Sequence, residues 1–141
     1  MNSDFEDGLR TALARSRDDD TGTRLSAIVD MASMAHDERV MARLVEMLDD
    51  PNVTVEVDAA EALACHGGTN GLLAVLENLG RRGDDGDSDY IAYKLNELNA
   101  TQVVKVFEIA DSIGVDRLST NQKLGVDDVR EVGGDVRRYQ A

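Results

Sequence analysis

The chain has 141 residues, of which 42% are hydrophobic, and 28 acidic against 15 basic residues give it a formal net charge of −13. This hydrophobic content is that of a folded protein, which excludes global disorder. A strongly negative surface repels phosphate backbones, which excludes nucleic acid as the expected partner. No apolar run approaches the roughly 18 residues of a membrane span, and the acidic residues 1–7 lack the features of a secretion signal. The predicted location is therefore the cytoplasm, without membrane contact.

Apolar residues recur at helical spacing along most of the chain, which predicts an all-α fold. Aromatic residues make up only 4% of the chain, and its only proline, Pro51, stands between two helical patterns. Asp4 is the expected cap of the first helix. The first six predicted helices cover residues 5–16, 23–35, 39–48, 53–65, 72–80 and 90–98. A seventh helix is predicted from a cap at residue 99 or 101 to residue 113, and residues 126–132 are a candidate short helix.

A sequence pattern recurs with a period of 32 residues. Its clearest copy is segment 50–64, in which Ala59 and Leu63 lie on one helical face. Ala27 and Met31 take the same places 32 residues earlier, and fainter matches follow 32 residues later. A fixed period of this length is typical of stacked helix pairs, which usually present a binding surface.

Segment 50–64 resembles the turn and first helix of a HEAT-like repeat of the short, bacterial-lyase-like type, and the resemblance extends over about residues 18–113. It implies a right-handed α-α superhelix of about three HEAT-like helix pairs, with an N-terminal helix and a C-terminal capping tail. The family usually has an arginine after the valine of the motif. Arg24 fills this place in the earlier copy, but Glu56 occupies it after Val55. Since that arginine ties neighbouring repeats through turn aspartates, the resemblance implies an interrupted ladder at Glu56.

Two regions are predicted: a helical repeat domain over residues 1–114 and a C-terminal tail over 115–141. The tail is expected to form a short helix, with Val126, Val129 and Val132 on one side, or to be partly disordered. An unrelated helical bundle remains the alternative fold.

Metal and cofactor chemistry is not predicted. His36, Cys65 and His66 are the only imidazole or thiol ligands, and no paired CxxC or HxxxH spacing accompanies them. Cys65 and His66 are adjacent, so they do not face each other on a helix, and no catalytic residue is assigned. Segment 85–89 has the alternating acids of a calcium loop, but Tyr90 stands where the tight-turn glycine belongs, so a solvated acidic loop is expected.

These observations favour a non-enzymatic protein–protein interaction module whose acidic helical-repeat surface binds a basic protein partner. An inhibitor or immunity-type role is the sharper form of this hypothesis. Its alternatives are an accessory subunit of a lyase or other enzyme of the HEAT-like class, and a purely structural scaffold that pairs with a second copy. The residues predicted to contact the partner lie on the repeat junctions: Asp49, Asp50, Glu56, Asp84, Asp85, Asp87 and Asp89.

Overall fold

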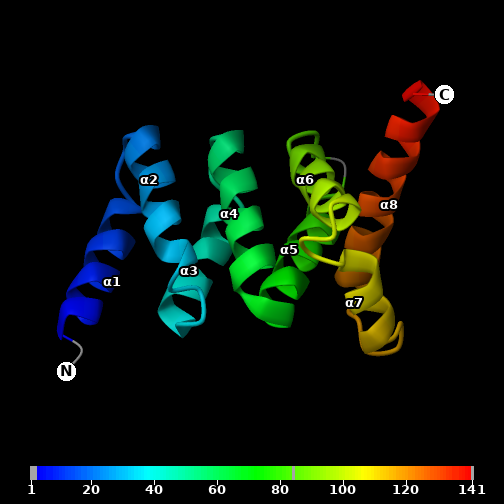
Figure 1. Ribbon diagram of the computed structural model, residues 1–141. Coiled ribbons are helices and arrows are strands. Elements are labelled where there is room, and N and C mark those ends of the chain that lie inside the picture. The colour runs from blue at the N-terminus through cyan, green and yellow to red at the C-terminus, as the bar shows by residue number, and fades with distance from the viewer. Residues whose placement is uncertain (1–2, 84, 141) are drawn as a thin grey trace.

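The computed structural model describes the backbone of residues 3–83 and 85–140, and the side chains as far as residue 133 apart from residue 84. All regular structure within these ranges is helical, which confirms the all-α prediction (Figure 1). The helices are α1 (Ser3–Arg15), α2 (Thr21–Ala32), α3 (Glu38–Met47), α4 (Val53–His66), α5 (Gly68–Arg82), α6 (Ser88–Ala100), α7 (Val106–Ile113) and α8 (Thr120–Gln140).

Three of these helices begin where a side chain caps the first free backbone amides. The carboxylate of Asp20 accepts a hydrogen bond from the Thr23 amide at 2.8 Å. The carboxylate of Asp37 accepts one from the Arg39 amide, at the start of α3, at 2.8 Å. Asn52 accepts one from the Thr54 amide at 2.9 Å. Such caps satisfy amides that have no partner inside the helix. Asp4, the expected cap of the first helix, lies instead inside the first turn of α1, where a negative charge stabilises the helix.

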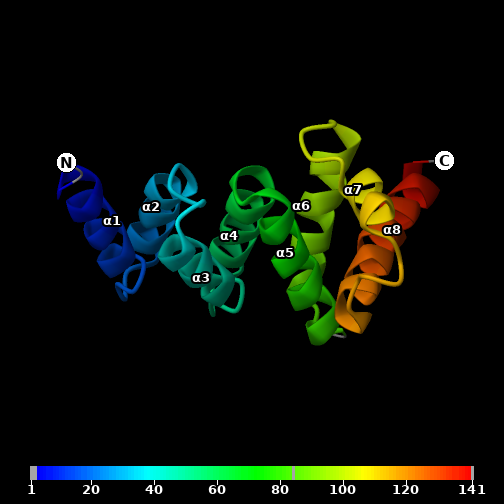
Figure 2. The same cartoon turned by 90° about the horizontal axis from the view of Figure 1, so that it is seen from below.

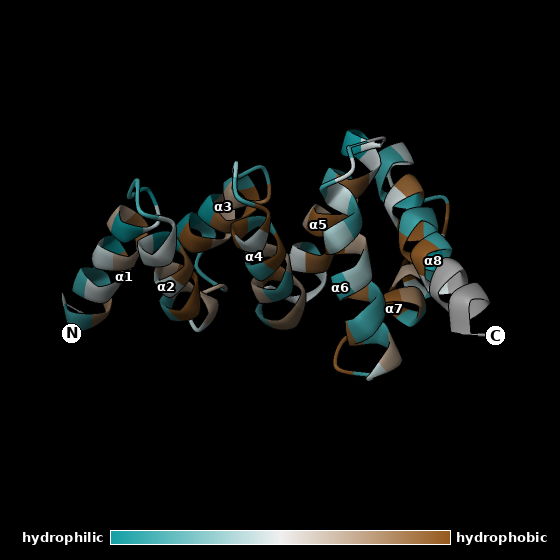
Figure 3. Ribbon diagram, turned by 90° about the horizontal axis from the view of Figure 1, so that it is seen from above, coloured by the Kyte–Doolittle hydropathy of each residue, from teal (hydrophilic) through white to brown (hydrophobic). Residues whose placement is uncertain are grey.

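The helices follow one another along a single row, with the two termini at opposite ends (Figures 1 and 2). Side by side in this row, α4 contacts α2 and α6, while α5 contacts α3 and α8. The apolar residues lie mainly where the helices meet (Figure 3). The largest fully buried side chains are leucines, methionines, one isoleucine and one valine: Leu9, Met31, Val40, Leu44, Met47, Leu48, Leu63, Leu72, Leu76, Leu79, Ile91 and Leu95.

The seventh predicted helix is wrong in its first half. Helix α6 continues to Ala100, and residues 101–105 form a turn before α7 begins at Val106. Gln102 adopts a positive φ of 63° in this turn, and the Val104 amide bonds to the Leu98 carbonyl at 3.2 Å. A residue in the left-handed region is a common way to end a helix, because it directs later amides back to the last free carbonyls.

The C-terminal tail also differs from the prediction. In place of a short helix or disorder, residues 120–140 form the longest helix of the described chain, which packs along α5 and α6. Val126, Val129 and Val132 are buried on one side, as predicted. A side chain at Gly125 would collide with the Leu76 backbone. Glycine therefore allows α8 to approach α5 closely, a contact that the periodicity of the tail alone does not reveal.

Candidate functional site: an acidic pocket between α6 and α8

Two of the predicted contact residues already form ion pairs within the chain. Both carboxylate oxygens of Asp50 accept hydrogen bonds from Arg24, each at 3.0 Å, and only 6% of the Asp50 side chain is exposed. Asp49 accepts bonds from Arg81 at 2.8 Å and from the side-chain amide of Asn78 at 3.0 Å. These carboxylates are already neutralised, so they add little to an acidic binding surface.

Glu56 was expected on the exposed acidic rim, and the structure corrects this placement. Its side chain is only 3% exposed and accepts a hydrogen bond from Arg82 at 2.6 Å. Burial raises the pKa of Glu56, while the guanidinium of Arg82 opposes this shift. The expected interruption of the ladder at Glu56 is also wrong. The position still carries an ion pair, with the acid and the base exchanged relative to Arg24 and Asp50.

The remaining predicted residues lie in the connection between α5 and α6 and in the first turn of α6. Asp84 lies outside the described residues. Asp85 accepts a bond from Arg82 at 2.7 Å and one from the Asp87 amide at 3.0 Å. Arg82 and this amide bond lower the pKa of Asp85. Asp87 and Asp89 are exposed. The loop is therefore held in place from within, through Asp85.

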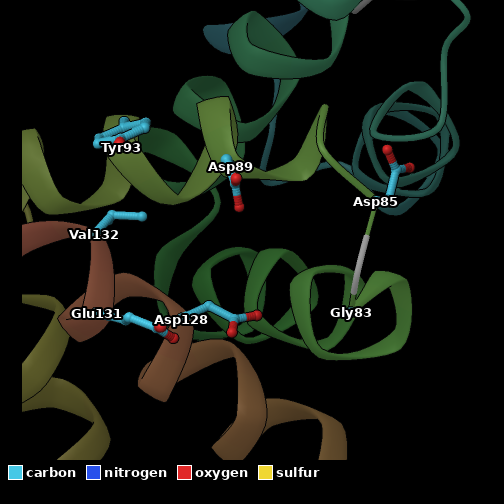
Figure 4. Close-up of a pocket in the computed structure, with 7 residues that line it drawn as sticks. All are labelled: Gly83, Asp85, Asp89, Tyr93, Asp128, Glu131 and Val132. Atoms are coloured by element: carbon cyan, nitrogen blue, oxygen red, sulfur yellow. The ribbon is translucent and has the colours of Figure 1, made fainter. Parts of the chain in front are cut away.

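An acidic pocket of about 350 Å³ lies where this loop and α6 face α8. Asp89 of α6 and Asp128 of α8 face each other across it, with Glu131 one turn further along α8 (Figure 4). The complete lining is Gly83, Asp85, Asp89, Tyr93, Asp128, Glu131 and Val132. None of these residues is basic, so the pocket brings four carboxylates together on an open surface.

The electrostatics of the pocket favour a cation. Partial burial raises the pKa of Asp128, and the carboxylates of Glu131 and Asp89 raise it further. Within the described part of the chain, no lysine or arginine forms an ion pair with Asp89, Asp128 or Glu131. A guanidinium or ammonium group entering the pocket would relieve this repulsion.

The sequence prediction missed Asp128 and Glu131. Their spacing of three residues puts them on one side of a helix, and this signal was available once residues 126–132 were expected to be helical. Their pairing with Asp89 was not available, because it depends on how α8 packs against α6.

The imidazole and thiol groups remain apart from this pocket. His36 and His66 are exposed, and Cys65 is half-buried on α4. Burial raises the pKa of the Cys65 thiol, which disfavours the reactive thiolate. Across the described side chains, of residues 3–83 and 85–133, no three from His, Cys, Asp or Glu are grouped as metal ligands. No helix in these ranges is long and apolar enough to cross a membrane.

Comparisons of the chain with protein-family models, with curated proteins and with solved structures found no match. The fold and the pocket therefore define the class of the protein directly: an all-α protein of packed helices with an acidic pocket at one edge.

Proposed function

We propose that the chain is a non-enzymatic protein-binding module that presents an acidic helical-repeat surface to a basic protein partner. The observation that carries this proposal is the acidic pocket, where carboxylates from α6 and α8 meet without a basic lining residue. Exposed, unneutralised carboxylates attract a cationic surface over long range and select it over acidic ones.

The proposed architecture is a right-handed α-α superhelix of three HEAT-like helix pairs: α2 with α3, α4 with α5, and α6 with α8. Helix α1 precedes the first pair, and the short α7 is inserted within the third. Two features support this. The contacts of α4 with α2 and α6, and of α5 with α3 and α8, are those of stacked pairs. The ion pairs Arg24–Asp50 and Glu56–Arg82 also repeat one spacing of 26 residues.

The test is affinity capture from a lysate of the source organism with the wild-type protein and two charge-matched variants as bait. The site variant carries Asp89→Asn, Asp128→Asn and Glu131→Gln. The control variant neutralises three exposed acids that do not line the pocket: Asp4→Asn, Asp7→Asn and Asp116→Asn. Both variants change the net charge by +3, and circular dichroism checks that both stay folded.

We expect the wild-type and control baits to retain the same basic protein at low salt and to release it at high salt, while the site variant retains at least tenfold less. Equal retention by the two variants would show that general acidity, and not the pocket, causes binding. If the wild type retains no basic protein, the proposed function is wrong.

A further inference from the structure

A second surface, separate from the acidic pocket, lies along the outer side of α4. Asp58, Glu61 and Cys65 follow at helical spacing on this side, with an apolar hollow to either side of the helix. The hollow between α4 and α2 has a volume of about 220 Å³, and the one between α4, the start of α5 and the α6–α7 turn has about 460 Å³. Cys65 lines both hollows, so they adjoin across α4.

Each hollow exposes a valine that a folded protein would normally cover. Val29 lines the first hollow and is 73% exposed, and Val103 lines the second and is 63% exposed. Val103 is held at the surface by the backbone, because it lies in the turn between Gln102, with its positive φ, and Val104, whose amide bonds to Leu98. Figure 3 shows this turn as an apolar segment at the surface.

The acidic charges of this surface lie at the smaller hollow, because the larger one is lined by both Lys105 and Glu108. Asp58 and Glu61 are half-buried and line the smaller hollow. Lys94 of α6 is the basic side chain whose charge acts on both of them, but its ammonium group donates a hydrogen bond to Glu97 at 2.9 Å. One cation already bonded elsewhere does not neutralise two carboxylates, so the smaller hollow keeps acidic side chains beside its apolar residues.

We propose that the two hollows and the carboxylates at the smaller one form one docking groove for an extended segment of a partner protein, in which apolar side chains flank a lysine or arginine. The apolar side chains enter the hollows, and the cation lies beside Asp58 and Glu61. The two hollows lie on either side of α4, and an α-helix with its side chains is about 10 Å wide. An extended chain covers this distance in about three residues, which sets the spacing of the two apolar side chains.

Charge excludes a second copy of this chain as the occupant. Two copies meeting on this face would bring the same carboxylates together, and each carries a net charge of −13. The groove shares no residue with the acidic pocket, so this proposal does not depend on the proposed function.

The experiment uses a phage-displayed library of 12-residue random peptides as the probe, selected on the full-length protein. We expect the enriched peptides to contain a lysine or arginine between two apolar residues. Fluorescence anisotropy of one such peptide measures its affinity for Val29→Asp and Val103→Asp, which change exposed side chains. Val115→Asp is the matched control, because Val115 is also 63% exposed but lies outside the groove.

We expect Val29→Asp and Val103→Asp each to weaken peptide binding at least tenfold and Val115→Asp to change it less than twofold. Asp58→Asn with Glu61→Gln should weaken binding and reduce its salt dependence. Saturating peptide should also slow alkylation of Cys65, the only cysteine of the chain, at least fivefold. Failure to enrich such peptides, or equal affinity for all three aspartate variants, overturns the proposal.

The site variant of the acidic pocket separates the two proposals. If Asp89→Asn, Asp128→Asn and Glu131→Gln abolish peptide binding while the groove variants do not, the peptide binds in the acidic pocket. The groove proposal then fails, and the proposed function does not.

Discussion

The junction between α3 and α4 and the junction between α5 and α6 use an ion pair at the same spacing but with reversed charges. In the first, Arg24 on α2 bonds to Asp50 in the turn after α3. In the second, Glu56 on α4 bonds to Arg82 at the end of α5. Both arginines also donate to main-chain carbonyl groups, Arg24 to those of two turn residues and Arg82 to that of Leu48.

This comparison shows that the position requires complementary charges and not one particular residue. The reversal also has a consequence for specificity. Exchanging partners between the two junctions would place Arg24 against Arg82 and Asp50 against Glu56, and like charges would repel. The reversed pair therefore disfavours that exchange of partners.

The two pairs differ in depth, and this predicts their relative contributions. The side chains of Arg82 and Glu56 are 8% and 3% exposed, against 12% and 6% for Arg24 and Asp50. Removing one member of a buried pair leaves the other charged and desolvated. We expect Arg82→Met to lower the free energy of unfolding at pH 7 by about 3–5 kcal/mol, as measured by chemical denaturation.

The control for this prediction exchanges the two charges. The double variant Glu56→Arg with Arg82→Glu restores complementary charges in the polarity of the first junction, so it should be clearly more stable than either single variant. A double-mutant cycle without a favourable coupling energy would show that charge complementarity does not stabilise this junction.

The second largest effect is expected where α8 meets α5. Gly125→Ala places a methyl group against the Leu76 backbone, and overpacking of this kind costs about 1–3 kcal/mol. Gly8→Ala is the matched control, because nothing lies within 4 Å of its added methyl group. We expect that control to stabilise α1 by about 0.5–1 kcal/mol. Thermal unfolding of both variants measures the contrast, and equal melting temperatures would contradict the close approach of α8 to α5.

Arg24→Met should destabilise the protein less than Arg82→Met does. The first pair lies nearer to the solvent, so water can hydrate Asp50 once the guanidinium is gone. Chemical denaturation of the two variants under the same conditions compares them directly. A loss for Arg24→Met as large as that for Arg82→Met would show that depth does not set the contribution of the pair.

The smallest expected effect is a pH dependence that differs between α1 and α4. Hydrogen bonds from Arg39 lower the pKa of Asp37 to about 2 and also lower that of Glu6, so Arg39 links α3 to α1. A depressed pKa contributes stability above the unfolded value near 3.8, and this contribution is lost as pH falls towards 2. Amides of α1 should therefore lose protection from hydrogen exchange between pH 5 and pH 2, after correction for the intrinsic rate.

The pKa shift of Glu56 changes the stability with pH in the opposite direction. Burial raises its pKa above the usual value of 4.5, so the folded state takes up a proton at a higher pH than the unfolded state does. Mild acidification above pH 4.5 therefore favours the folded state at this position.

Arg39→Met is the control for the effect at α1: it should remove the pH dependence of the α1 amides. If these amides respond to pH equally with and without Arg39, the link between α1 and α3 does not cause the effect.

The order and approximate limits of helices α2 to α5 were predictable from the sequence. Helical periodicity and capping residues such as Asn52 act within a few residues, so they are visible in any local stretch of the chain. The same holds for the buried face of the tail, where Val126, Val129 and Val132 share one side.

Contacts between distant residues were decided only by the tertiary structure. Glu56 reads as an exposed acid until Arg82, 26 residues away, is placed beside it. The length of α8 depends on packing against α5, which Gly125 permits. The acidic pocket requires Asp128 to face Asp89. Hydrophobic patterns specify which side of a helix is buried, but they do not specify its neighbour, because apolar contacts are non-directional and many pairings would bury the same residues.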